Sequence, residues 1–237
     1  MPADATLFLS RWADVVAFGM LVGGWLSYPI LLAVLGHSRA TLNDTMVEIR
    51  CAWMVSMLRR ENRITDAALV GHVISSASFF ASTTVLVIGA LFGALANAGA
   101  IVDTVGQFLV DHPPTVWITQ LKTVVILMIF VYGFFKFTWA IRQYNYMIAM
   151  FGAAPPAPLP EALIGKLSVI YAKHFSRAAQ DFNHGLRAYY FGLAGFAWFI
   201  DPLIVPPALL FIMAILVRRQ TRSAVLEDVQ AARMALR

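Results

Sequence analysis

Three long apolar stretches, at residues 13–35, 72–98 and 117–139, constrain this chain more than any other feature of its sequence. A helix needs about 20 mostly apolar residues to cross the hydrocarbon core of a bilayer, and each stretch meets that length. The chain is 59% hydrophobic and only 13% charged, whereas a soluble domain carries about 25% charged residues. The sequence therefore predicts an all-α, polytopic helical membrane bundle that occupies residues 1–237 as a single integral membrane domain.

A fourth apolar region is interrupted by the sequence DPLIVPP, which contains Asp201 and three prolines. Proline in a helix interior removes a backbone hydrogen bond and clashes with the preceding turn, so one uninterrupted helix is not expected here. We predict two helices, at about residues 188–200 and 206–217, joined by a tight turn. They form either two crossings or a re-entrant hairpin, which gives four to five transmembrane helices in total.

The positive charges are distributed unevenly along the chain. All but two of the 18 lysines and arginines lie in or beside the segment between the first two spans, the segment between the third and fourth, and the C-terminal tail. Cytoplasmic segments of membrane proteins collect lysine and arginine. We therefore expect a multi-pass protein of the bacterial inner (cytoplasmic) membrane, with its N-terminus outside and its C-terminus cytoplasmic. The net charge of +5 is then mostly a consequence of topology, and nucleic acid is not expected as a partner.

Two cytoplasmic segments, at about residues 42–60 and 161–187, have the one-sided apolar spacing of amphipathic helices. In the second segment the polar face is formed by Lys166, Lys173, Arg177, Gln180 and His184. The simpler interpretation is a solvated face attracted by anionic headgroups of the lipid bilayer, at about 1 kcal/mol per basic residue. The alternative is a docking face for a partner protein. A membrane-protein partner and a homo-oligomer both fit the sequence.

Six of the ten residues in SSASFFASTT, residues 75–84, carry hydroxyl groups although they lie inside the second apolar stretch. Small residues four apart allow membrane helices to approach closely, and hydroxyls in helices can bond to their own backbone. These hydroxyls point to all sides of the helix, whereas a polar path would need one stripe. We predict a helix-packing surface inside the bundle, with a polar path as the alternative. The predicted packing residues are Gly71, Ser75, Ser78, Ser82, Gly89 and Gly93.

Three polar segments, RENRITD, FKFTWAIRQYNY and DFNHGLRAYYF, are expected at the same depth near the cytoplasmic edge of the bundle. If the helices pack, their charged and amide groups meet, because an unpaired charge at that depth is costly. We predict a polar cluster that acts either as a clamp on helix register or as a pocket for a headgroup, an anion or a quinone ring. Its members are Asn62, Arg63, Asp66, Lys136, Arg142, Asn145, Asn183, His184 and Arg187.

The same segments carry a family resemblance. ENRITD, FFASTT, FKFTWAIRQYNY and FNHGLRAYYF resemble the hallmark segments of an uncharacterised membrane family, domain of unknown function 599, from about Trp53 to Arg222. The resemblance implies a multi-pass helical membrane protein, with bacterial members and no assigned activity. It implies no catalytic residues for this chain.

The sequence gives little reason to expect a cofactor. Cys51 is the single cysteine, which excludes an intrachain disulfide and a cysteine-based metal site within one chain. A b-type haem held by His72 and His184 is an alternative, because both lie near the inner edge of a span, but boundary histidines are more often interfacial polar residues. HExxH, P-loop, GxSxG and dinucleotide motifs are missing from the sequence. We therefore predict no cofactor, no metal and no catalytic residue.

The expected function follows from these features. Our first hypothesis is a scaffold or accessory subunit of a membrane complex, which acts by binding and is not an enzyme. The second is a small transporter or channel for an anion or amphiphile, with Lys122, Lys136, Arg142 and Arg187 involved. Lys122 and Lys136 share a face of the third span, although two anchors that snorkel to opposite interfaces explain their spacing more simply. The third is a membrane redox or lipid-modifying protein that uses the polar cluster.

Overall fold

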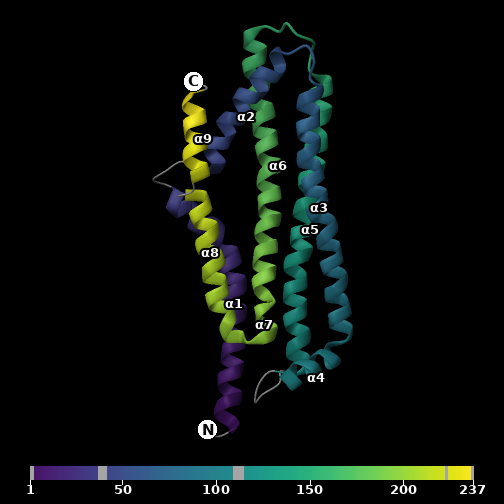
Figure 1. Cartoon of the computed structure of the whole chain (residues 1–237), viewed down its shortest axis with the longest axis vertical. Helices are drawn as coiled ribbons and strands as arrows, with labels where there is room; N and C mark the ends of the chain where they lie inside the picture. The colour runs from purple at the N-terminus through teal and green to yellow at the C-terminus, as the bar shows by residue number, and fades with distance from the viewer. Residues whose placement is uncertain (1–2, 37–41, 109–114, 222–223, 236–237) are drawn as a thin grey trace. The chain divides into compact units, whose positions relative to one another are not determined.

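Every element in the described part of the chain is helical (Figure 1). The structure, a computed structural model, describes residues 3–36, 42–108, 115–221 and 224–235. In chain order the elements are α1 (Ala3–Gly36), α2 (Leu42–Arg59), α3 (Ile64–Ala96), α4 (Ala98–Phe108), α5 (Val116–Ala153), α6 (Glu161–Gly195), α7 (Ala197–Ile200), η1 (Pro202–Ile204), α8 (Val205–Thr221) and α9 (Ala224–Ala235). The prediction of an all-α chain is confirmed.

Three helical stretches of the described chain are long and apolar enough to cross a membrane: Ile64–Ala96, Val116–Ala153 and Pro202–Ala235. The third passes over residues 222–223, which lie outside the described ranges. The chain therefore has the features of a helical membrane protein. The expected four to five crossings are not confirmed, because the stretches at 13–35 and 188–200 are not among the three.

The helix boundaries differ from the expected ones mainly in α5 and α6. The expected cytoplasmic helix at 161–187 and the beginning of the expected span at 188–200 form one continuous helix, α6. No proline lies within α6, so no residue stops the helix where its composition changes from polar to apolar. For the same reason α5 continues past residue 139 to Ala153 before the proline-rich linker.

The DPLIVPP turn forms as the sequence predicts. The side chain of Asp201 accepts a hydrogen bond from the backbone nitrogen of Leu203 at 2.7 Å, which caps the short helix η1. Pro206 and Pro207 lie in the first turn of α8, where the backbone N–H that proline lacks would have no partner within the helix. The turn therefore ends one helix and begins the next without breaking either.

The chain forms two compact units, each assembled from three separate segments. Unit 1 contains Met1–Ala33, Thr83–Phe134 and Leu186–Leu216. One part of its core joins α1, α5, α6, α7 and α8 through Leu21, Ile129, Phe191, Trp198 and Leu209. A second part is formed by Leu91, Ile126, Leu127 and Phe130.

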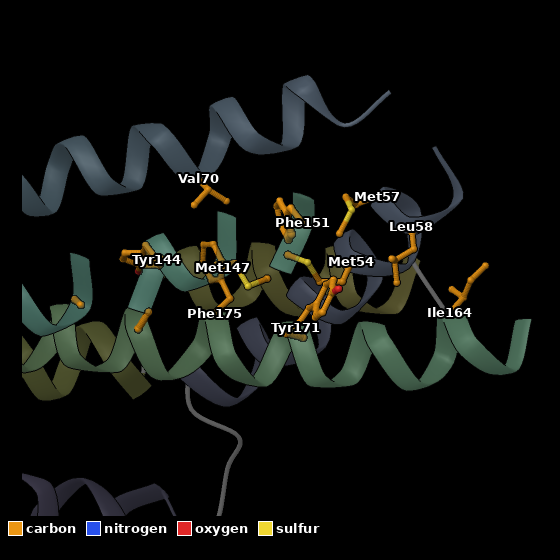
Figure 2. Packing of buried hydrophobic residues seen from close by; sticks show 13 residues of the cluster. Met54, Met57, Leu58, Val70, Tyr144, Met147, Phe151, Ile164, Tyr171 and Phe175 are labelled. Carbon is orange, nitrogen blue, oxygen red and sulfur yellow. The ribbon is translucent and has the colours of Figure 1, made fainter. Parts of the chain in front are cut away.

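Unit 2 contains Val34–Ser82, Phe135–Gly185 and Val217–Arg237. Its core is rich in methionine and aromatic side chains, and Figure 2 shows Met54 of α2 and Tyr171 of α6 beside Phe151 of α5. Helix α9 packs on α2. Arg233 of α9 forms a bidentate ion pair with Glu48 of α2, and the distance from Arg233 Nε to Glu48 Oε2 is 2.6 Å. Unit 2 thus has an interior of its own.

Glycines of α6 provide the close helix contacts in both units. In unit 2, a Cβ atom at Gly185 would lie 2.6 Å from Phe137 Cε1 of α5. In unit 1, a Cβ atom at Gly192 would lie 2.6 Å from Phe130 Cε2. Each phenylalanine ring therefore packs directly on the backbone of α6, which requires glycine there because of space and not because of backbone conformation.

Among the described residues, the glycines predicted as part of a packing surface on α3 make no close contact with another helix. A Cβ atom at Gly71, Gly89 or Gly93 would meet nothing within 4 Å. Ser75 and Ser82 are exposed and Ser78 is half-buried. The buried face of α3 is formed instead by Asp66, Val70, Ala77, Ala81, Thr84 and Leu91. Small size alone therefore did not identify which face of α3 contacts other helices.

Candidate functional site

The corner between α2 and α3 in unit 2 holds three of the predicted cluster residues. Asn62 accepts a hydrogen bond from the backbone nitrogen of Ile64 at 2.9 Å and so caps the start of α3. Asp66 is fully buried, and its carboxylate accepts from Arg60 Nη1 at 2.8 Å and from Trp53 Nε1 at 2.7 Å. The donors compensate for the burial of this carboxylate, and the bonds connect the end of α2 to the start of α3.

Arg63, the third residue at this corner, binds the two residues that directly follow α5. Its guanidinium donates to the carbonyl oxygen of Ala154 at 2.8 Å and to that of Pro155 at 2.7 Å. The last carbonyl groups of a helix have no partner within the helix, so a cation is favourable there. Asn62, Arg63 and Asp66 therefore connect α2, α3 and the chain after α5 within unit 2.

An open groove of about 420 Å³ lies between α5 and α6 in unit 2. Its α5 side is formed by Trp139, Gln143 and Tyr146, and its α6 side by His174, Arg177, Gln180, Asp181 and His184. The spacing of four and three residues on α5 places its three side chains on one face of that helix. The groove is polar and aromatic, in contrast to the core of the same unit.

One wall of the groove is fixed by a network around Asp181. Lys136 Nζ lies 2.7 Å from Asp181 Oδ1, and Gln143 Nε2 donates to Asp181 Oδ2 at 2.7 Å. The carboxylate is therefore neutralised by a lysine and held by an amide from the facing helix. His174 Nε2 lies 3.0 Å from the backbone carbonyl of Gln143, and because a carbonyl can only accept, this ring nitrogen carries the hydrogen.

The positive charge in the groove comes from Arg177. Its side chain is exposed, and it has no acidic partner in the part of the chain that the structure describes. A second cation contacts a residue of the lining, since Arg142 Nε donates to the hydroxyl oxygen of Tyr146 at 2.6 Å. Asp181 is the one carboxylate among the described residues of the lining, and it is already balanced by Lys136. The groove thus favours a negatively charged group.

The predicted cluster is therefore divided between several places. His184 lines the groove, and Lys136 and Arg142 support residues that line it. Asn145 is exposed, and Asn183 contacts Asn43 through a long amide contact of 3.5 Å. The remaining member, Arg187, belongs to unit 1 and lies over the ring of Tyr28, 4.8 Å from its centroid.

Residues outside the predicted cluster contribute most of the groove. Gln143 and Asp181 lie within two of the polar segments, but their spacing in the sequence does not predict that they pair. Arg177 lies on the polar face that the sequence predicts for residues 161–187, whereas Tyr146 and His174 are not part of that face. The meeting of the three depends on how α5 packs against α6. The spacing of Trp139, Gln143 and Tyr146 along one helix face was the available indication.

Arg50 of α2 is a further cation of unit 2 that the sequence did not single out. Its guanidinium donates to Ser176 Oγ at 3.1 Å and lies 5.4 Å from the centroid of the Phe175 ring. Burial lowers the pKa of Arg50 from its usual value, and the nearby Tyr144 opposes this shift. The contact with an aromatic face compensates in part for the lost hydration.

The structure corrects the expectation that Lys122 snorkels to the surface. In unit 1, Lys122 is only 4% exposed, and its Nζ lies 2.8 Å from Asp14 Oδ1 of α1 and 3.1 Å from the carbonyl oxygen of Trp198. The indole nitrogen of Trp198 donates to the same Asp14 oxygen at 2.7 Å. The amine stays inside because it finds two acceptors there. This triad links α1, α5 and α7.

The two histidines considered as haem ligands differ in their surroundings. His72 is exposed on α3 and is not among the groove residues, whereas His184 lines the groove. In the described residues no group of three or more His, Cys, Asp and Glu side chains has an arrangement that could hold a metal ion.

The fold and its polar sites define a helical membrane protein with a polar, basic groove in one of its two units. The chain belongs to the DUF599 family, described as proteins of unknown function, whose family model matches residues 16–225. The resemblance predicted from the sequence is therefore confirmed over most of the chain. No curated protein and no solved structure matches the chain.

Proposed function

We propose that the protein acts in the membrane by binding, and that the groove between α5 and α6 receives the acidic headgroup of an amphiphile. The observation that carries this proposal is Arg177, a cation in the groove lining without an acidic partner in the described chain. A guanidinium offers five N–H donors in a fixed plane, which suits phosphate and carboxylate groups.

The surroundings of Arg177 support the same interpretation. The lining contains two aromatic side chains, Trp139 and Tyr146, and a volume of about 420 Å³ is within the usual range of small-molecule sites. Aromatic residues with a polar edge favour the boundary between lipid and water. A headgroup in this groove would leave its apolar chains against the exposed apolar side chains of the helices.

A wider role and a location belong to this proposal. The protein would serve a larger membrane complex as an accessory or scaffold subunit in the bacterial inner membrane, with its N-terminus outside and its C-terminus cytoplasmic. The supporting observation is the concentration of lysine and arginine in the segments expected on one side. An anion route is less well supported, because Lys122 is paired with Asp14 and Lys136 with Asp181.

The test is a titration of the purified protein in neutral detergent with short-chain lipids, one anionic and one zwitterionic. We expect Arg177→Gln to weaken binding of the anionic lipid by about 10-fold or more, since a hydrogen bond to a charged group contributes about 1.5–3 kcal/mol. Lys173→Gln is the matched control. It removes the same charge from an exposed position one turn away on α6 that does not line the groove.

Two outcomes would contradict the proposal. If Lys173→Gln weakens binding as much as Arg177→Gln, the interaction is with the general charge of the helix and not with the groove. If wild-type protein binds the zwitterionic lipid as tightly as the anionic one, charge recognition is not the function of this site.

A further inference from the structure

We propose that the group held in the groove is a phosphomonoester, and this inference rests on the proposed function above. The groove differs from a simple positive surface in two respects: how many charges remain unbalanced, and how many donors it directs to one place. Both can be read from the contacts of Arg142, Tyr146, Arg177 and Asp181.

Two cations near the groove have no acidic partner in the described chain, and a ligand with two negative charges would balance both of them. Lys136 and Asp181 neutralise each other at 2.7 Å. Arg177 and Arg142 remain, and neither has an acidic partner in the described ranges. A phosphomonoester carries about −1.5 to −2 at pH 7, because its second pKa is about 6. A phosphodiester or a carboxylate carries a single negative charge and would leave one cation unbalanced.

The donors also favour a group with several free oxygens. The hydroxyl oxygen of Tyr146 already accepts from Arg142 Nε at 2.6 Å. Its own hydrogen is therefore free to be donated elsewhere, and the neighbouring guanidinium strengthens that donation by withdrawing charge. Tyr146 lines the α5 side of the groove and Arg177 lines the α6 side. A phosphomonoester has three unesterified oxygens and can accept from both sides at once.

The fixed wall of the groove explains why an anion is tolerated next to a carboxylate. Asp181 receives Lys136 on one oxygen and Gln143 on the other. Both oxygens are occupied by donors, so the carboxylate presents little free negative charge to a ligand. Gln180, which also lines the groove, adds an amide group that can donate to a phosphate oxygen.

The experiment compares three probes on the intact protein in neutral detergent: dihexanoyl phosphatidic acid, dihexanoyl phosphatidylglycerol and inorganic phosphate. The first lipid is a phosphomonoester and the second a phosphodiester with the same chains. We expect phosphatidic acid to bind at least about 10-fold more tightly than phosphatidylglycerol, because it gains one further charge-assisted hydrogen bond. Inorganic phosphate separates the sources: similar affinity to phosphatidic acid indicates a free phosphate compound, and weaker affinity indicates a lipid headgroup.

Tyr146→Phe removes only the hydroxyl group, and Arg142→Gln removes the cation that donates a hydrogen bond to that hydroxyl group. We expect each variant to reduce the preference for phosphatidic acid several-fold while Lys173→Gln leaves it unchanged. Thermal unfolding followed by circular dichroism checks that each variant is folded. We expect unchanged unfolding temperatures, because Arg142 and Tyr146 are exposed.

The outcomes separate this inference from the function on which it rests. If both anionic lipids bind equally and both respond to Arg177→Gln, the groove binds anions but the phosphomonoester inference is overturned. If neither lipid responds to Arg177→Gln, the proposed function fails as well. If wild type prefers phosphatidic acid but Tyr146→Phe and Arg142→Gln keep the full preference, the assigned donors are wrong and the inference is overturned.

Discussion

Replacing Gly192 with alanine tests how closely α5 and α6 approach in unit 1. The new methyl group would lie 2.6 Å from Phe130 Cε2 and 2.8 Å from Cζ, whereas carbon atoms prefer about 3.5–4.0 Å. The ring or the helix must therefore move by about 1 Å. Phe130 is 1% exposed and packs against Tyr189 and Phe196, with centroid distances of 5.2 and 6.0 Å. The ring consequently has little room to move.

The expected loss of stability follows from these distances. Overpacking a core costs about 1–3 kcal/mol, and two contacts below 3.0 Å place this variant in the upper part of that range. Alanine returns up to about 1 kcal/mol through its higher helix propensity. We expect Gly192→Ala to lower the free energy of unfolding by about 1–2 kcal/mol overall.

The assay is unfolding in mixed micelles of increasing SDS fraction, followed by far-ultraviolet circular dichroism. Gly89→Ala is the matched control on α3, because its methyl group would meet nothing within 4 Å. It should be as stable as wild type or up to about 1 kcal/mol more stable. Adding Phe130→Leu to Gly192→Ala should relieve the clash and recover part of the loss. The reasoning is refuted if Gly192→Ala is as stable as Gly89→Ala.

Two further predictions concern the buried ion pair and the threading of the chain. Asp14→Asn should lower the free energy of unfolding by about 3 kcal/mol, because it leaves the buried charge of Lys122 without its partner. Lys122→Met should cost less, because Asp14 is partly exposed and keeps its hydrogen bond from Trp198. The double variant should recover most of the larger loss. Unfolding in the same micelles measures all three, and a double variant no more stable than either single one contradicts the pairing. Reporter enzymes fused at the C-terminus and inserted near Asp103 should report opposite sides of the membrane. Activity of both reporters in one compartment would show that the predicted threading is wrong.

The helical architecture could be predicted from the sequence because apolar length and proline placement act locally. The cap at Asp201 and the prolines at the start of α8 lie where local rules place them. The extent of α6 could not be predicted, because a change from polar to apolar composition looks like a boundary although the backbone continues through it. Composition describes the surroundings of a helix, whereas only a residue such as proline interrupts its hydrogen bonds.

The candidate site was predicted only in part, for a related reason. Asn62, Arg63 and Asp66 lie within a few residues of one another, and the contacts of Asn62 with Ile64 and of Asp66 with Arg60 are local. The pairing of Gln143 with Asp181 joins residues that are far apart in sequence, and it depends on the register of α5 against α6. The register is set by packing, which sequence spacing alone does not give.

The same limit explains the two sets of glycines. Gly89 and Gly93 fit the small-residue pattern on α3 but face open space, whereas Gly185 and Gly192 are seven residues apart on α6 and lie under phenylalanine rings. Gly89 and Gly93 have the four-residue spacing of small residues at helix contacts, whereas Gly185 and Gly192 have the seven-residue spacing that keeps two residues on one helix face. The difference lies in the partner helix, where Phe130 and Phe137 are also seven residues apart.

The pairing of phenylalanine with glycine makes the contact between α5 and α6 one-sided. All of the side-chain volume at these two places comes from α5, while α6 contributes bare backbone. A mutation on α6 can only add atoms, so it meets resistance whatever residue it introduces. A mutation on α5 can remove atoms, and the two helices can then settle closer together. Substitutions at this contact should therefore be tolerated on α5, at Phe130 and Phe137, and not at Gly185 and Gly192 on α6.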